Sequence, residues 1–126
     1  MRLVLDAGAL IALDRNDRAM WTRLKAALLA GERPLTHGGV VGQAWRAGGA
    51  RQARLAVALA GVEVRALDDI AGRAAGELLA RCRLRDVIDA ALVLLAHDGD
   101  QVVTSDPEDL AALARAAGRD LELVRA

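Results

Sequence analysis

The sequence predicts an α/β fold, a doubly wound and mainly parallel β-sheet flanked by helices. Two observations favour it. Short apolar or alternating segments alternate with helical patterns along the chain, and 54% of the residues are hydrophobic, which suits a sheet covered on both faces. The 126 residues show no linker, repeat or low-complexity segment. We therefore expect a single domain over 1–126.

Four segments have the patterns of strands. Leu3–Leu5 and Gln101–Ser105 carry the apolar runs of buried parallel strands. Val62–Leu67 alternates with period two, which is typical of a half-exposed strand. Leu121–Val124 is a last short candidate.

Helical patterns fill the segments between these strands. A loose turn, 36–39, leads into the third helix, and glycine or proline follows several of the helices. Pro107 supports the last predicted helix, because proline is favoured in the first turn of a helix. The predicted helices are Ala7–Leu13, Met20–Leu29, Gly38–Ala47, Gln52–Leu59, a helix capped by Asp68-Asp69 that runs to about Cys82, Val87–His97, and a helix opened by Asp106-Pro107.

Composition excludes several classes of protein. The formal net charge is zero, which disfavours a globally basic nucleic-acid binder but leaves room for a local basic patch. A lone cysteine, Cys82, excludes a disulfide framework or a cysteine metal site within the chain. Charged residues interrupt every apolar run before it reaches membrane-spanning length, and no signal-peptide pattern begins the sequence. We expect a cytoplasmic protein with no membrane partner.

Three aspartates fall where an α/β sheet places its ligands. Asp6 ends the first predicted strand and Asp106 follows the strand Gln101–Ser105, while Asp89 lies in the first turn of the helix before that strand. Ligands of open α/β sheets bind outside the carboxyl ends of the strands. Three carboxylates that share one crevice need compensation, and a hard divalent cation such as Mg²⁺ supplies it.

Each acid also has a purely structural interpretation. Asp86 and Asp89 fit the N-cap and N3 positions of a helix, and Asp106 before Pro107 fits an N-cap. That interpretation is weakest for Asp6, because an unpaired acid at the end of a buried strand is costly. Residue types alone leave both interpretations open.

Four segments contain the candidate acids or lie between them in the chain. They are Leu5-Asp6-Ala7-Gly8-Ala9-Leu10-Ile11-Ala12-Leu13, Val40-Val41-Gly42-Gln43-Ala44-Trp45-Arg46, Asp86-Val87-Ile88-Asp89-Ala90 and Val102-Val103-Thr104-Ser105-Asp106-Pro107. Taken together and in this order, they resemble PIN-domain ribonucleases, most closely the VapC-type toxins of bacterial toxin–antitoxin systems. The similarity spans Leu3 to about Leu113. The fold of that family is a doubly wound parallel sheet.

The resemblance implies roles for individual residues. Asp6 matches the first metal-binding acid, Asp89 a later one and Asp106 the final one, and Thr104 matches a hydroxyl residue two positions before that final acid. In such enzymes Mg²⁺ or Mn²⁺ activates water for attack on an RNA phosphodiester and neutralises charge on the phosphate. The products expected are a 5′-phosphate and a 3′-hydroxyl.

The sequence departs from the family pattern at two positions. Ala7 stands where Ser or Thr commonly follows the first acid, and Gln43 stands where a glutamate is common. Asp86 and Asp109 are candidates to restore the missing charge, although we expect Asp86 to act mainly as a cap and Asp109 mainly as a first-turn helix acid.

The leading functional hypothesis is a metal-dependent endoribonuclease that is neutralised by an antitoxin and forms a homodimer. The alternative is a PIN-fold protein that binds RNA or its antitoxin but cuts weakly or not at all, because Gln43 supplies no charge. A phospho-accepting receiver domain is disfavoured, since the pair Asp68-Asp69 follows a later strand and Lys25 lies in an early helix.

The remaining polar residues carry weaker predictions. Arg46, Arg51 and Arg54 are the best candidates to contact an RNA backbone, against the alternative of a solvated helix face. His37 and His97 are too isolated in the sequence for a histidine metal site. Asp14 is expected at the surface.

Overall fold

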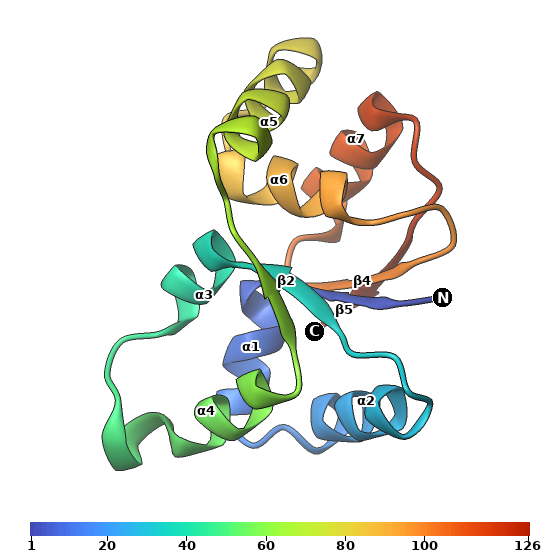
Figure 1. The fold of residues 1–126 in the computed structure, drawn as a ribbon. Helices are drawn as coiled ribbons and strands as arrows, with labels where there is room; N and C mark the ends of the chain where they lie inside the picture. The colour runs from blue at the N-terminus through green and yellow to red at the C-terminus, as the bar shows by residue number, and fades with distance from the viewer.

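The five strands form one parallel sheet, in a computed structural model that describes all residues, 1–126. The strand order is β3-β2-β1-β4-β5 (Figure 1). All neighbouring pairs are parallel, so the predicted α/β fold class is confirmed. The strands are β1 (Leu3–Leu5), β2 (Leu35–His37), β3 (Glu63–Arg65), β4 (Gln101–Thr104) and β5 (Glu122–Arg125).

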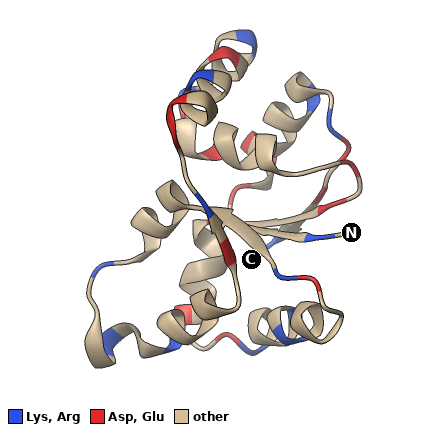
Figure 2. Cartoon of the chain, viewed as in Figure 1, with Lys and Arg blue, Asp and Glu red and all other residues tan.

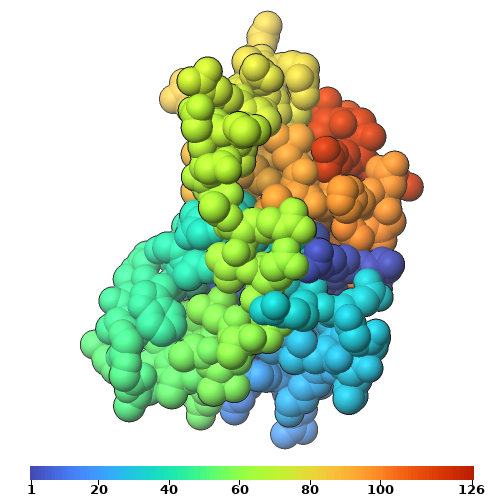
Figure 3. Space-filling model, in the orientation of Figure 1, coloured from blue at the N-terminus to red at the C-terminus, as the bar shows by residue number.

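Helices cover both faces of this sheet as two layers (Figure 1). Residues 66–68, which follow β3, run across the molecule from the helices on one face of the sheet to those on the other (Figure 3). The first layer contains α1 (Ala7–Asp14), α2 (Arg18–Leu29), α3 (Gly38–Ala44) and, after a short 3₁₀ turn (Gly49–Gln52), α4 (Ala53–Ala60). The second layer contains α5 (Asp69–Cys82), α6 (Val87–Leu95) and α7 (Pro107–Ala117).

The direction of strand addition reverses at β1. The chain adds β2 and β3 on one side of β1, then returns to add β4 and β5 on the other side. Leu5 of β1 pairs with Val103 of β4, so the carboxyl ends of these two strands lie side by side. This is the switch point at which α/β sheets form their ligand crevices.

Strand β2 replaces the predicted loose turn at 36–39, and that prediction was wrong. The strand has only three residues and two of them are polar, so it lacks the apolar run that identifies a buried strand. Burial is possible because both polar side chains have partners. The Thr36 hydroxyl donates to the Leu5 carbonyl at 2.7 Å, and both ring nitrogens of His37 are hydrogen-bonded.

Helix α3 ends at Ala44, three residues before the predicted end. The side chain of Gln52 accepts hydrogen bonds from the backbone N–H groups of Arg46 and Ala47, at 2.8 and 2.9 Å, in place of helical carbonyls. The same side chain donates to the Asp14 carboxylate at 3.3 Å. Asp14 is half-buried with its other oxygen enclosed and unpartnered, so its predicted surface position was wrong.

The core is built from Leu, Val and Ala of both layers and the central strands, together with Met20. Helix α6 is its centre, since Ala90, Ala91, Leu92 and Val93 are all buried. No helix is long and apolar enough to cross a membrane.

Candidate metal centre

The structure places the three predicted acids around the carboxyl ends of β1 and β4. Asp6 directly follows β1, Asp106 comes two residues after β4, and Asp89 lies in the first turn of α6. Asp6 and Asp89 are only 6% and 8% exposed, whereas Asp106 is exposed. The site therefore has two buried carboxylates and one at its open side.

A buried threonine connects Asp6 with Asp106. The Thr104 hydroxyl donates to Oδ2 of Asp6 at 2.7 Å and accepts from the backbone N–H of Asp106 at 2.9 Å. The other oxygen of Asp6 accepts from the N–H of Ala7 at 2.7 Å. These bonds fix the orientation of the Asp6 carboxylate, and Thr104 also fixes the turn that carries Asp106.

Asp86 caps α6, as the sequence predicts. Its Oδ1 accepts from the N–H groups of Ile88 and Asp89, at 2.9 and 3.1 Å. Asp89 lies in the same first turn, near enough to the other acids for their charges to act on its carboxyl group. Burial, and after it the charges of Asp6, Asp86, Asp106 and Asp109, raises the pKa of Asp89 to about 7.

Asp106 is at the N-cap position of α7, but its side chain accepts no capping hydrogen bond. The interpretation of this acid as a side-chain cap is therefore wrong. Asp109 is in the first turn of α7, as expected. The neighbouring Asp106 charge raises the pKa of Asp109.

No basic side chain compensates these charges. The ion pairs of the chain are Arg2–Glu63, Arg65–Glu63, Arg73–Asp69 and the amino terminus with Glu32, and none involves the acids near the switch point. No three acidic, histidine or cysteine side chains are close enough together to form a complete metal-binding group. A hard cation that keeps several of its waters needs only one or two carboxylates, so the residues present fit Mg²⁺ or Mn²⁺.

Ala7 and Gln43, which depart from the pattern of PIN-domain ribonucleases, add no charge to the site. Ala7 contributes only its backbone N–H, to Asp6. Gln43 is exposed on α3, and its side chain forms no hydrogen bond. Further negative charge near the site comes from Asp86 and Asp109. Both of these acids help to raise the pKa of Asp89.

Gly8 allows α1 to approach the turn that carries Asp106, a contact not identified from the sequence. A Cβ atom at Gly8 would lie 2.8 Å from Cβ and Oγ of Ser105 and 2.9 Å from its backbone nitrogen. The contact with backbone cannot be relieved by a rotamer change. The absence of a side chain at Gly8 thus sets the spacing between α1 and the residue before Asp106.

Gly8→Ala is expected to lower the free energy of unfolding by about 1–3 kcal/mol, the usual cost of overpacking, and to displace Asp106. Urea unfolding measures the first effect and Mn²⁺ titration the second. Gly76→Ala is the matched control, because a Cβ there meets nothing within 4 Å in the middle of α5. It should stabilise the protein by about 0.5–1 kcal/mol. Equal effects of the two substitutions would contradict this account of Gly8.

The raised pKa of Asp89 predicts a pH dependence of stability without metal. The pKa is about 7 in the folded chain and 3.8 without that environment, so the folded state binds more protons between these values. Stability from this group is present below about pH 4 and is lost as the pH rises through about 7. Asp89→Asn should therefore improve stability relative to the wild type more at pH 8 than at pH 5. Urea unfolding with EDTA measures this difference, and an equal effect at both pH values would contradict it.

The predicted RNA-contact arginines lie along the connection from α3 into α4, where basic positions gather (Figure 2). Arg46 and Arg54 are exposed, and Arg46 donates to the carbonyls of Gly42 and Trp45. Arg46 and Arg51 line a polar pocket of about 340 Å³ together with Asp14, Ala47 and Gln52. Both arginines thus line one recess of the first helical layer.

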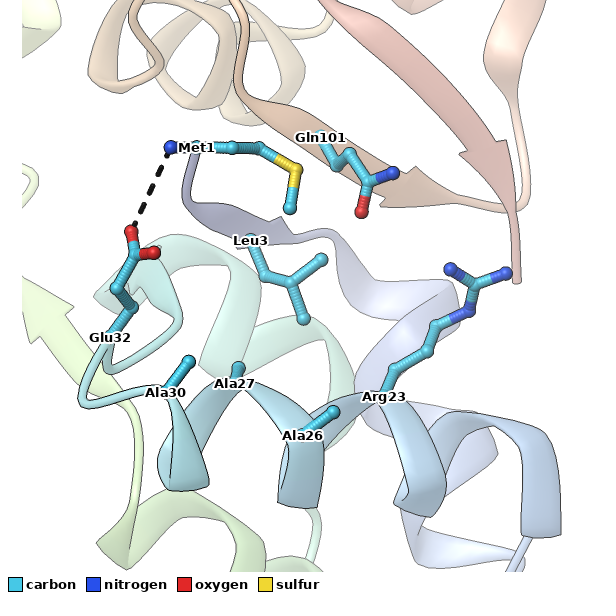
Figure 4. A pocket seen from close by; sticks show the side chains of 8 residues that line it. All are labelled: Met1, Leu3, Arg23, Ala26, Ala27, Ala30, Glu32 and Gln101. Atoms are coloured by element: carbon cyan, nitrogen blue, oxygen red, sulfur yellow. Dashed lines mark ion pairs between the residues drawn. The ribbon is translucent and has the colours of Figure 1, made fainter.

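An apolar pocket of about 260 Å³ lies at the opposite end of the sheet, between α2 and the first residues of β1 and β4 (Figure 4). The amino group of Met1 and Glu32 form an ion pair of 3.9 Å at its rim. It contains none of the site acids. The lining residues are Met1, Leu3, Arg23, Ala26, Ala27, Ala30, Glu32 and Gln101.

The strand order and the two helical layers define a PIN-like α/β fold. The fold is similar to that of a chain in the crystal structure of VapBC2 from Rickettsia felis, solved bound to a DNA fragment from their promoter. The TM-score is 0.69, and the similarity covers 98% of both chains at 14% sequence identity. No protein-family model and no curated protein matches the sequence.

Proposed function

We propose that the chain is a metal-dependent endoribonuclease of the VapC type, a toxin that hydrolyses RNA phosphodiester bonds and is neutralised by an antitoxin. The observation that carries the proposal is the group of uncompensated carboxylates, Asp6, Asp89 and Asp106, at the switch point of a PIN-like sheet. A protein that gathers acids without basic partners destabilises itself unless a cation joins them.

The chain's own residues have defined roles in this proposal. Asp6 and Asp89 would bind Mg²⁺ or Mn²⁺ from the buried side, and Asp106 would reach the ion from the open side through one of its waters. Thr104 would keep Asp6 oriented. When bound, the cation would activate water and neutralise charge on the scissile phosphate. Asp86 and Asp109 would add negative charge around the ion.

A second candidate is a PIN-fold protein that binds RNA or an antitoxin with weak or no nuclease activity. The specific observation in its favour is Gln43, an exposed amide where the resemblance leads us to expect a glutamate. An amide can accept a hydrogen bond but supplies no charge and cannot act as a base. Cleavage by the wild-type protein separates the two candidates.

Arg46, Arg51 and Arg54 are the proposed contacts to the RNA backbone, because guanidinium groups bind phosphate with two hydrogen bonds. The antitoxin is the proposed protein partner, since the structural neighbour is itself part of a VapBC pair. A homodimer stays a prediction of the resemblance.

The test is cleavage of structured RNA by the purified protein with Mn²⁺ or Mg²⁺, and again with EDTA. The proposal predicts metal-dependent products that carry 5′-phosphates and 3′-hydroxyls. Metal-independent cleavage would contradict it, and RNA binding without any cleavage would support the second candidate. In cells, induced expression should arrest growth, and co-expression of the product of a short adjacent upstream gene should restore it.

A further inference from the structure

We infer that His37 is a positioning residue for the candidate metal centre, and this inference rests on the proposed function. His37 ends β2 and is only 1% exposed. It lies between α3, which carries Gln43, and the first turn of α6, which carries Asp89. Its imidazole connects these two helices through hydrogen bonds on both ring nitrogens.

The two hydrogen bonds define the tautomer of His37. Nδ1 accepts from the backbone N–H of Gly39 at 3.1 Å, so this nitrogen carries no proton. Nε2 lies 2.9 Å from the carbonyl oxygen of Ile88 and therefore donates its proton to it. The neutral ring caps α3 with one nitrogen and holds the residue before Asp89 with the other.

Gly39 makes this contact possible. A Cβ atom at position 39 would lie 2.5 Å from Cδ1 of Ile88 and 2.9 Å from Cε1 of His37. The start of α3 and the start of α6 are therefore as close as a residue without a side chain permits. His37, Gly39 and Ile88 together form a bridge between the helices, which we call the His37 bridge.

The His37 bridge acts on the metal centre through Asp89. The carbonyl that accepts from His37 belongs to Ile88, and the next residue is the buried acid of the site. Asp86 holds the same turn from the outside by accepting from the N–H groups of Ile88 and Asp89. His37 holds this turn from the buried side, through its hydrogen bond to the Ile88 carbonyl. Loss of the histidine should therefore let the first turn of α6 move relative to Asp6.

His37→Asn tests the bridge without removing the cap of α3. The Asn side chain can accept from the Gly39 N–H as an N-cap, but it has no atom in the place of Nε2. The Mn²⁺ affinity of the His37→Asn variant should fall about 10- to 100-fold, the usual effect of losing a residue that orients a metal ligand. Amide hydrogen exchange over residues 88–91 should become faster at the same time.

Asp100→Asn is the matched control. Asp100 is also a buried side chain that bridges two segments, since it accepts from the N–H of Arg2 and the N–H of His97, both at 2.9 Å. It lies at the opposite end of the sheet, just before β4. It should lower stability while leaving Mn²⁺ affinity within about twofold of wild type, because it orients no metal ligand.

Gly39→Ala provides a second variant should His37→Asn not fold. Its Cβ would lie 2.9 Å from Cε1 of His37, whose ring is held by two hydrogen bonds, as well as against Ile88, so it should weaken Mn²⁺ binding as His37→Asn does. Ile88→Val removes Cδ1, and the double variant should recover part of the lost affinity. No recovery, or unchanged Mn²⁺ affinity and exchange in both bridge variants, would overturn the inference, as would an equal loss in Asp100→Asn.

The exchange measurement keeps this inference separate from the proposed function. If the wild-type protein binds no Mn²⁺ and cuts no RNA, the proposed function fails. Faster exchange over residues 88–91 in His37→Asn would then still support the bridge, and unchanged exchange would overturn it.

Discussion

Asp6→Asn is expected to reduce metal-dependent RNA cleavage more than about 100-fold. Loss of a residue that merely orients a metal ligand costs 10- to 100-fold, and Asp6 is proposed as the ligand itself. The substitution keeps the shape of the side chain. Its amide oxygen can still accept from the Ala7 N–H, and its amide nitrogen can donate to the Thr104 hydroxyl, which donates to Asp6 in the wild type. Its effect should therefore come from lost charge, measured as kcat/KM on a defined RNA with Mn²⁺.

Asp98→Asn is the control for this prediction. Asp98 is an exposed aspartate in the turn before β4, at the opposite end of the sheet, and its Oδ1 accepts from the N–H of Asp120 at 2.8 Å. Asn can accept the same bond, so cleavage should stay within about twofold of wild type. Equal cleavage by wild type and Asp6→Asn would contradict the nuclease assignment.

Leu92→Ala is expected to lower the free energy of unfolding by about 2–5 kcal/mol, the range measured for buried leucines. Leu92 is completely buried in α6, the helix at the centre of the core. A domain of this size is stable by only about 5–15 kcal/mol, so the variant loses a large share of its stability. Urea unfolding followed by circular dichroism measures the change.

Leu29→Ala is the matched control for the core prediction. Leu29 ends α2 with 90% of its surface exposed, so the same substitution removes almost no buried area there. Its free energy of unfolding should change by less than about 0.5 kcal/mol. A loss at Leu92 no larger than that at Leu29 would contradict the central place of α6 in the core.

The parts of the fold that the sequence predicts are those whose signal is local. The buried run of α6, the period-two pattern around β3 and the proline that opens α7 all identify their elements. Strand β2 has no such signal. Its burial depends on a hydrogen bond from Thr36 to β1 and on the partners of His37, which no sequence window contains.

The candidate site also has features that the sequence predicts and features that depend on the fold. Chain order and residue type bring Asp6, Asp89 and Asp106 to one end of the sheet, because the carboxyl ends of parallel strands share an edge. The missing cap at Asp106 and the close approach of Gly8 to Ser105 depend on backbone positions. The isolation of His37 in the sequence argues against a histidine metal site, but its contact with Ile88 depends on the fold and has no signal in the sequence.

Titration of the wild-type protein with Mn²⁺ at pH 8, followed by calorimetry, tests the central claim most directly. Above the raised pKa of Asp89 no proton competes for its carboxylate, so binding is strongest there. We predict saturable binding that is lost in Asp6→Asn and kept in Asp98→Asn. Absence of binding in the wild type, or equal binding by wild type and Asp6→Asn, would contradict the assignment of these carboxylates as a metal centre.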